Sequence, residues 1–321
     1  MKAIQVHEFG DAAVMRYEDI ADPIAAAGEV VIKVEAIGVN PVDTYIRSGV
    51  HLIKPELPYI PGGDAAGTIL SLGDGVSQFE VGDRVYVANS SGGGSYAEKA
   101  RLPADSILTL PDNVSFAQGA AIGTPYGTAY WALVNRGRGK AGETVLVHGA
   151  SGAVGNAALQ IAKSMGITTI GTAGSERGLE LARQQGAAHA LNHTEDGYLD
   201  AIGELTGGKG PDLILEMLAN VNLPRDMEVA AKYGRIVVIG NRGPVEINPR
   251  EAMMKELDIL GIARFNATPE QMAALNAAIG CGLADGSLNP VIGKEMPLAQ
   301  AVDAHHAVLQ PGAYGKIVLI P

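Results

Sequence analysis

Residues 143–163, ETVLVHGASGAVGNAALQIAK, combine a strand, a glycine-rich turn and a helix in one short stretch. The run 144–147 is typical of a buried parallel strand, and from Ala153 onward the apolar positions recur at helical spacing. Glycines stand between the two, at Gly149, Gly152 and Gly155. Such a turn lets the backbone approach a pyrophosphate, which the amides of the helix N-terminus attract. The stretch predicts a dinucleotide-binding unit; a ligand-free turn is the alternative, because the glycine spacing departs from the commonest fingerprint.

Hydrophobic periodicity divides the chain into a β-rich part and an alternating part. Up to about residue 120, apolar runs such as 29–36 and 83–88 are broken by Gly, Pro and Asp, and a short helix is expected at 41–47. Beyond that point the alternation of strands and helices predicts a doubly wound parallel sheet in an α/β protein. The strands expected in this sheet are 144–148, 167–172, 189–191, 212–216, 235–239 and 257–262, and a terminal strand at 315–320 is expected to return to the first region. The expected helices are 126–134, 153–165, 176–185, 196–205, 224–232, 269–284 and 298–309.

Composition bears on partners and compartment. The formal net charge of −11 and the lack of any Lys/Arg-rich run disfavour nucleic-acid binding. The single cysteine, Cys281, excludes an intrachain disulfide and a cysteine-rich metal site, and its helical segment predicts a core position. No run approaches the ~20 apolar residues of a membrane span, and the first residues lack a secretory apolar stretch. We expect a cytoplasmic protein without membrane contact.

The end of the second strand of the dinucleotide unit bears on the choice of coenzyme. In such folds this position is acidic when it binds a ribose 2′-hydroxyl. Here it is Gly174, which leaves space, and Ser175 and Arg177 could meet a 2′-phosphate by hydrogen bond and by charge. These residues favour NADPH over NADH. Glu176 could still reach the ribose, and the segment could also be a solvated helix start.

Several motifs together carry a resemblance to a known family. They are GVNPVDTYIRSG (38–49), LPYIPGGDAAG (57–67), GDRVY (82–86), AAIGTPYGTAYWAL (120–133), VLVHGASGAVG (145–155), EMLANVNL (216–223) and GNRGPVEINPRE (240–251). With them, essentially the whole chain resembles the medium-chain dehydrogenase/reductase superfamily and, within it, the zinc-independent quinone oxidoreductase, or ζ-crystallin-like, branch.

This resemblance implies an architecture and a set of cofactor contacts. It implies a GroES-like partial β-barrel catalytic domain (1–122 and 265–321), a Rossmann NADPH-binding domain (123–264) and an active site in the cleft between them. The implied contacts are Tyr45, Ser151, Gly152, Ala153, Val154, Gly174, His193, Asn222, Ile239, Gly240, Asn241, Arg242, Ile262, Ala263 and Arg264, with Thr128 near the nicotinamide. Gly155, Ser175 and Arg177 join this set from the arguments above. A plain loop histidine is the alternative for His193.

The resemblance also bears on metal use. In zinc alcohol dehydrogenase relatives a Cys near position 40, a His near 62 and a later Cys hold the catalytic metal. This chain has Asn40 and Gly63 at the first two places, and Cys281 is far from the third. We therefore expect no metal to polarise the hydride acceptor. A quinone or enone is already electrophilic and mainly needs positioning beside the nicotinamide.

Residues of the 38–51 segment are implied at the substrate end. Asn40, Asp43 and Tyr45 would face the substrate, and the Tyr45 hydroxyl could donate to a quinone oxygen as charge develops. Alternatively, Asn40 caps the short helix, Tyr45 packs in the core, and Asp43 forms a surface ion pair with Arg47 at i and i+4. His51 could donate a proton at the substrate entrance or be merely exposed.

We predict an NADPH-dependent, zinc-independent quinone reductase. An enone or enoyl-thioester reductase of the same fold is the nearest alternative, since His51 or Tyr45 could supply the proton it needs. A non-catalytic NADPH-binding structural or RNA-binding protein is the alternative from another class; the acidic balance and the glycine turn argue against it. The short apolar strand at 258–262, expected at a sheet edge, predicts a homodimer or a homotetramer.

Overall fold

The computed structural model describes residues 1–89 and 94–321, which form two compact units. The first unit comprises Met1–Pro125, Asn289–Gln310 and Gly315–Pro321, and the second comprises Tyr126–Leu288 and Pro311–Tyr314. The sequence analysis instead places domain boundaries after residues 122 and 264. The second boundary differs because the long helix α9 (Pro269–Ala284) belongs to the second unit, and the chain re-enters the first at Asn289.

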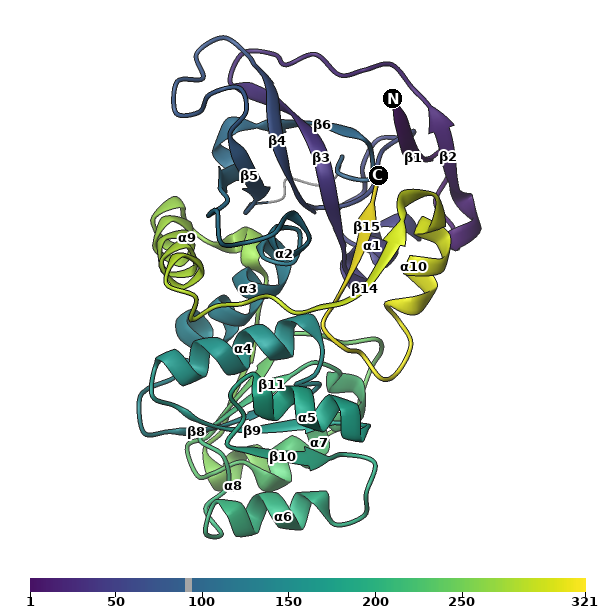
Figure 1. Ribbon diagram of the computed structural model, residues 1–321. Helices are drawn as coiled ribbons and strands as arrows, with labels where there is room; N and C mark the ends of the chain where they lie inside the picture. The colour runs from purple at the N-terminus through teal and green to yellow at the C-terminus, as the bar shows by residue number, and fades with distance from the viewer. Residues whose placement is uncertain (90–93) are drawn as a thin grey trace. The chain divides into compact units, whose positions relative to one another are not determined.

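The first unit is built on a mostly antiparallel sheet of seven strands (Figure 1). Its order is β14-β15-β3-β4-β5-β7, with β6 also paired to β3. These strands are β3 (Glu29–Val39), β4 (Asp64–Leu72), β5 (Arg84–Val87), β6 (Lys99–Pro103), β7 (Ile107–Thr109), β14 (Ile292–Pro297) and β15 (Lys316–Ile320). The long strand β3 is rich in the β-branched residues that favour a pleated surface and pairs with three other strands.

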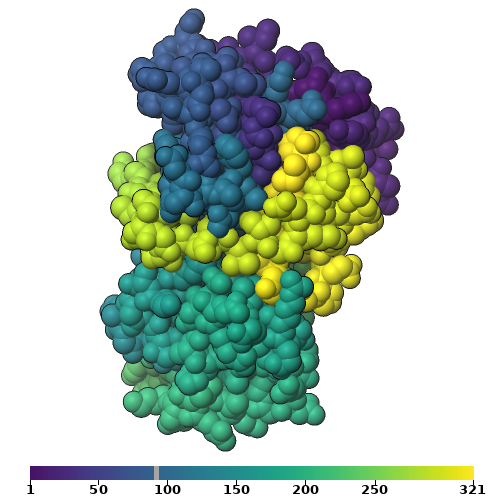
Figure 2. Space-filling view, viewed as in Figure 1, coloured from purple at the N-terminus to yellow at the C-terminus, as the bar shows by residue number. Residues whose placement is uncertain are grey.

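Short elements surround this sheet. They are the hairpin β1 (Lys2–Val6) and β2 (Met15–Asp19) and the helices α1 (Pro41–Arg47), α2 (Phe116–Gly119) and α10 (Ala301–Ala307), while α3 (Gly123–Tyr130) runs across the boundary of the units. Helix α10 contacts α1 and the 3-10 turn Ala12–Val14. In Figure 2 the yellow C-terminal residues accordingly lie beside the purple N-terminal ones.

A parallel sheet of six strands forms the centre of the second unit. Its strands are β8 (Thr144–Val147), β9 (Thr168–Ala173), β10 (His189–Asn192), β11 (Leu213–Glu216), β12 (Arg235–Val238) and β13 (Asp258–Gly261). Their order, β10-β9-β8-β11-β12-β13, is the 3-2-1-4-5-6 order of doubly wound dinucleotide-binding sheets. The prediction of a doubly wound parallel sheet is thus confirmed, and β13 lies at one edge.

Helices cover this sheet and bury its apolar strands. They are α4 (Ala153–Ser164), α5 (Glu176–Gln184), α6 (Tyr198–Leu205), α7 (Ala219–Val229) and α8 (Pro249–Lys255). One core joins Leu146, Ile170, Ile214 and Ile236 of four strands to apolar residues of α6, α7 and α8. Because side chains alternate along a strand, Val145 and Val147 face the other way, and α4 contacts that same strand β8.

Two local expectations about this unit are wrong. Helix α7 begins at Ala219 and not at Pro224, because Glu216 accepts hydrogen bonds from the backbone N–H of Leu218 and from Nδ2 of Asn222 and so holds the first turn. Cys281 is exposed and not in the core. Helix α9 buries Leu275, Ile279, Gly282 and Leu283, a face that turns Cys281 outward.

No helix in the described part of the chain is both long and apolar enough to cross a membrane.

Truncation of a central strand residue tests this account of the core. Leu146 on β8 is fully buried, so we expect Leu146→Ala to lower the free energy of unfolding by about 2–5 kcal/mol. Leu205 at the end of α6 is 40% exposed, and Leu205→Ala is the matched control with a much smaller effect. Guanidinium denaturation monitors both variants. Equal losses for the two would contradict the assignment of Leu146 to the core.

Candidate functional site

The predicted coenzyme contacts of the second unit follow the carboxyl ends of the parallel strands. Residues 151–155 come after β8, 174–177 after β9, His193 after β10, Asn222 after β11, 239–242 after β12 and 262–264 after β13. Because all six strands are parallel, these segments meet at one edge of the sheet. The strand order reverses between β8 and β11, and ligands of doubly wound sheets bind at that point.

The glycine turn after β8 fits the close approach of an anionic group. Gly149 has a φ of +56°, and a Cβ on Gly155 would lie 2.4 Å from the carbonyl oxygen of Gly149. Gly152 caps α4 without a side chain, so the first amides of the helix stay open to a ligand. Ser151 is buried, and its Oγ donates to the carbonyl oxygen of Ala313 at 2.7 Å. The residues of this turn therefore fit a pyrophosphate.

The segment after β9 is open to solvent and carries a cation. Gly174, Ser175 and Arg177 are all exposed. Ser175 caps α5, since its Oγ accepts from the N–H of Gly178 at 3.2 Å, and the Arg177 guanidinium lies 3.8 Å from the ring centroid of Tyr314. Stacking holds the guanidinium at the start of α5. The cap agrees with the alternative prediction that this segment is a solvated helix start.

His193 lies beside this segment. A Cβ on Gly174 would come within 3.1 Å of His193 Nε2, so the imidazole borders the space that the glycine leaves. Burial, and secondly the neighbouring His148, lowers the pKa of His193. A neutral imidazole at the sheet edge can donate or accept a hydrogen bond.

The remaining coenzyme segments are tied to one another by hydrogen bonds. The N–H of Ala219 donates to the carbonyl oxygen of Gly240 at 3.0 Å, and the N–H of Arg242 donates to Asn220 Oδ1 at 2.9 Å. On α3, a Cβ on Gly127 would lie 2.1 Å from Arg264 Nη1. The half-buried Thr128 follows Gly127 in the same helix.

In the first unit, Asn40 directly precedes α1, Asp43 lies in its first turn, and Tyr45 lies in its second half. Tyr45 is half-buried, whereas Asn40 and Asp43 are buried. Asp43 Oδ2 accepts from the backbone N–H of Asn40 at 2.8 Å and from the hydroxyl of Tyr96 at 3.4 Å. The predicted surface ion pair of Asp43 with Arg47 is wrong, because Arg47 is also buried and donates to the carbonyl oxygen of Gly10.

A directed chain of hydrogen bonds leads from Arg47 to Asp43. Arg47 Nη1 lies 3.2 Å from His305 Nδ1, and His305 Nε2 lies 3.1 Å from the Tyr96 hydroxyl. Since a guanidinium only donates, His305 accepts at Nδ1 and donates through Nε2, and Tyr96 donates onward to Asp43. Tyr96 and His305 were not predicted as site residues, because they lie far from Asp43 along the chain.

Burial controls the protonation of this chain. It raises the pKa of Asp43 to about 7, against the lowering effect of the hydrogen bond from Asn40. It also raises the pKa of Tyr96 well above its usual range and lowers that of His305 to about 3, where Arg47 adds to the effect. Tyr96 and His305 are therefore neutral near pH 7, and Asp43 exchanges its proton there.

The positions that hold zinc in alcohol dehydrogenase relatives do not fit a metal here. Asn40 Oδ1 accepts from the Lys316 ammonium, and Asn40 Nδ2 donates to Asp64 Oδ2 at 2.9 Å. Lys316 Nζ also lies 3.1 Å from Asp64 Oδ2, and both side chains are nearly inaccessible. Gly63 offers no ligand atom. The Lys316 ammonium therefore contacts Asn40 where a metal would bind in those relatives. The sequence signal for this cation is a lone lysine in the apolar run of β15.

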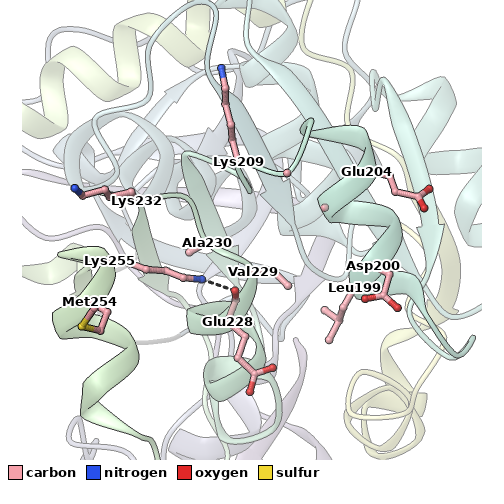
Figure 3. A pocket seen from close by; sticks show the side chains of 12 residues that line it. Leu199, Asp200, Glu204, Lys209, Glu228, Val229, Ala230, Lys232, Met254 and Lys255 are labelled. Carbon is pink, nitrogen blue, oxygen red and sulfur yellow. Dashed lines mark hydrogen bonds between the residues drawn. The ribbon is translucent and has the colours of Figure 1, made fainter.

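A pocket elsewhere in the second unit contains none of the predicted residues (Figure 3). It is lined by α6, by residues just ahead of β11 and β12, and by the end of α8, and so lies toward the amino ends of the strands. Lys255 Nζ donates to the carbonyl oxygens of Met227 and Glu228 at the end of α7. This lysine caps a helix, and we assign the pocket no ligand.

Comparisons with known proteins agree with this geometry. A family model described as "Alcohol dehydrogenase GroES-like domain" matches residues 26–112, and one described as "Zinc-binding dehydrogenase" matches 153–279. Human quinone oxidoreductase is 48% identical over 322 residues, which cover 100% of this chain and 98% of the human protein.

Solved structures give the same result. Escherichia coli quinone oxidoreductase complexed with NADPH matches with a TM-score of 0.89 and 29% identity over 100% of both chains. A mycobacterial protein complexed with NADPH matches with a TM-score of 0.91 and 31% identity, again over 100% of both chains. The fold and these matches define an enzyme of the medium-chain dehydrogenase/reductase superfamily, with a GroES-like and a Rossmann domain. Within that superfamily the chain belongs to the quinone oxidoreductases.

The Lys316–Asp64 pair should be required for the stability of the first unit. Lys316→Met leaves the Asp64 carboxylate buried without its cation, so we expect a loss of about 3–5 kcal/mol of unfolding free energy. Adding Asp64→Asn to Lys316→Met removes the unpaired charge and should restore part of the loss.

Thermal unfolding followed by circular dichroism measures these variants. Arg138→Met, which breaks the exposed pair with Asp258, is the control and should leave the unfolding temperature unchanged. A Lys316→Met protein as stable as this control would show that Asp64 does not depend on the ammonium.

Proposed function

We propose that this protein catalyses the NADPH-dependent reduction of quinones without zinc. The observation that carries the proposal is the convergence of the predicted coenzyme contacts at the carboxyl edge of the parallel sheet, around its switch point. The NADPH complexes of structurally similar proteins support the choice of coenzyme, and the human relative supports the choice of acceptor.

The proposed coenzyme segments bind different parts of NADPH. The amides of residues 152–155 bind the pyrophosphate, and Gly174 leaves room for the 2′-phosphate, which Ser175 and Arg177 bind. His193 and Asn222 border the adenosine half. The segments 239–242 and 262–264, with Thr128, hold the nicotinamide half.

The reaction consumes one quinone, one NADPH and one proton and yields a hydroquinone and NADP⁺. Bound NADPH supplies the two electrons together with one hydrogen. The half-buried Tyr45 orients the quinone, and its hydroxyl donates a hydrogen bond to the oxygen that gains negative charge. Asn40, bonded to Lys316 and Asp64, fixes the start of the same segment. Asp43, whose pKa burial raises to about 7, holds a proton close to these residues. No cation is needed, because the quinone is already electrophilic.

Initial rates with several acceptors test the proposal. We expect loss of NADPH absorbance with 1,2-naphthoquinone or 1,4-benzoquinone, slower loss with an aliphatic enone, and slower rates when NADH replaces NADPH. Turnover with the enone alone would instead indicate an enone or enoyl-thioester reductase. NADPH binding without any turnover would favour a non-catalytic protein, whose RNA binding a filter assay at several salt concentrations would reveal.

Arg177 is the residue on which discrimination between the coenzymes should depend. Arg177→Ala removes the cation for the 2′-phosphate, so we expect the KM for NADPH to rise about 10- to 100-fold while the KM for NADH hardly changes. Arg183→Ala is the matched control, because Arg183 lies on the same helix, is exposed and forms an ion pair with its neighbour Glu180. If both coenzymes lose affinity equally in Arg177→Ala, this role of Arg177 is refuted.

We propose a homodimer formed through β13 and a cytoplasmic location, the latter supported by the single cysteine. Strand β13 lies at the sheet edge, and Ile259 in its middle is 39% exposed. Sedimentation should therefore show a dimer, and Ile259→Lys should shift it toward the monomer by placing like charges across the two-fold axis. Val221→Lys, at a residue 49% exposed on α7, serves as the control and should stay dimeric. A monomeric unsubstituted protein would contradict this proposal.

A further inference from the structure

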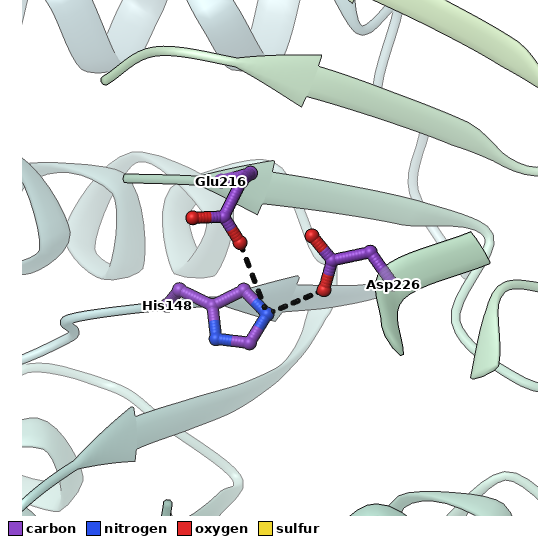
Figure 4. A group of neighbouring side chains, drawn as sticks. All are labelled: His148, Glu216 and Asp226. Atoms are coloured by element: carbon purple, nitrogen blue, oxygen red, sulfur yellow. Dashed lines mark hydrogen bonds and ion pairs between the residues drawn. The ribbon is translucent and has the colours of Figure 1, made fainter. Parts of the chain in front are cut away.

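A buried group of three titratable side chains lies at the switch point of the second unit (Figure 4). His148 directly follows β8, Glu216 ends β11, and Asp226 lies on α7. All three are at most 4% exposed. Strands β8 and β11 are the neighbours between which the strand order reverses. The group therefore lies at the edge where the proposed function places the coenzyme.

The hydrogen bonds of this group leave two acid oxygens facing each other. His148 Nε2 lies 2.8 Å from Asp226 Oδ1 and 3.5 Å from Glu216 Oε2. Glu216 Oε2 and Asp226 Oδ2 have no hydrogen-bond partner among the described residues, although both are buried. In Figure 4 the second oxygen of Asp226 points toward Glu216. Two carboxylates cannot satisfy each other, whereas a carboxylic acid can donate to a carboxylate.

We propose that Glu216 and Asp226 hold one shared proton beside His148, and that NADPH binding takes up a proton wherever this pair has lost it. The second part rests on the proposed function. Glu216 is a positioning residue here, since it acts through the segment it holds and not by contact with the substrate.

The second oxygen of Glu216 links the shared proton to the coenzyme edge. Glu216 Oε1 accepts from the N–H of Leu218 and from Asn222 Nδ2 at 3.2 Å. Loss of the proton would place two anions against each other and draw Glu216 away from these donors. Because Asn222 belongs to the proposed coenzyme contacts, the ionised pair should weaken binding. The anionic coenzyme itself adds to this preference for the protonated pair.

The surroundings of the group offer little else to neutralise it. Thr172 Oγ1 on β9 lies 3.4 Å from His148 Nδ1, and His193 after β10 is the further titratable neighbour. Strand β12, α6 and α8 contribute apolar side chains, such as Ile236, Ile202 and Ala252, to the apolar core of the second unit. Lys255 of α8 is directed to carbonyl oxygens at the end of α7.

The direction of the pH dependence follows from burial. Burial raises the pKa of both Glu216 and Asp226 to about 7, and for Glu216 the neighbouring Asp226 adds to this rise while His148 opposes it. Burial also lowers the pKa of His148, which stays neutral and donates through Nε2. Groups with raised pKa stabilise the fold at low pH, and this contribution is lost as the pH rises through about 7. Coenzyme affinity should weaken over the same rise.

Titration calorimetry of the full chain with NADPH at pH 8, in two buffers of different ionisation enthalpy, measures the proton uptake. We expect the unsubstituted protein to take up a fraction of a proton, and its Kd to rise by up to about tenfold per pH unit above pH 7. Glu216→Gln reproduces the protonated acid, because its amide can donate to Asp226 and its oxygen can accept from Leu218. This variant should bind NADPH with a nearly constant Kd from pH 7 to 9 and take up no proton.

The control is Glu204→Gln, an equally conservative change at the exposed Glu204 on α6, which should behave as the unsubstituted protein. Proton uptake that is equal with Glu216 and with Glu216→Gln would overturn the proposal. So would a stoichiometric metal ion, found by elemental analysis of the purified protein and absent from Glu216→Gln, since the three side chains would then be its ligands.

A separate measurement keeps this proposal distinct from the proposed function. If NADPH does not bind at any pH, the proposed function fails, but the shared proton is still tested by thermal unfolding between pH 5 and 9. We expect Glu216→Gln to reduce the loss of stability as the pH rises through 7. Parallel pH profiles for the two proteins would refute the shared proton.

Discussion

The parallel register of six strands is the constraint on which the site of the second unit depends. Parallel strands must each be followed by a crossover, so six turns begin at the same edge of the sheet. The turn after β8 carries the glycines that allow close backbone approach, and the turn after β9 carries the exposed Arg177. Residues that are far apart in the sequence can therefore bind one coenzyme, provided that each follows a strand of this sheet.

Both units contain buried carboxyl groups, whose charge must be balanced or removed. In the first unit Asp64 is paired with the Lys316 ammonium and accepts two hydrogen bonds from Thr124, both at 2.8 Å. In the second unit no lysine or arginine of the described residues forms an ion pair with Glu216 or Asp226, and a proton is the remaining means of removing one charge. A cation thus balances the buried carboxylate of the first unit, whereas the pair of the second unit is proposed to share a proton.

The sequence predicts the strands and helices well where periodicity is strong. Helix α1 at 41–47 and helix α9 at 269–284 have the expected bounds, since a proline at the first helical position marks each start. The start expected for α7, at Pro224, is wrong, because Pro224 lies inside the helix. The earlier first turn is held by Glu216, which accepts a hydrogen bond from Asn222 Nδ2. Local patterns cannot reveal a cap that comes from a neighbouring strand.

Some residues of the candidate site can likewise be predicted from local patterns, and others cannot. The glycines after β8 and the exposed Arg177 after β9 are local signals, and they predict two of the proposed coenzyme segments, whereas the other segments were implied by the family resemblance. Tyr96 and His305 could not be found from local patterns, because Tyr96 meets Asp43, and His305 meets Tyr96, only through the fold. Lys316 gave one local signal, a lone lysine in the apolar run of β15, but its partner Asn40 is set by the fold. For the same reason Asp43 and Arg47, one helical turn apart, bind separate buried partners and not each other.

Hydrogen–deuterium exchange with and without NADPH tests the central claim, that the coenzyme binds across the carboxyl edge of the sheet. We predict slower exchange of backbone amides in residues 149–155, 174–178, 217–222 and 239–242, with little change at 199–209 and 228–232. Protection at those last two segments, which line the pocket toward the amino ends of the strands, would contradict the account.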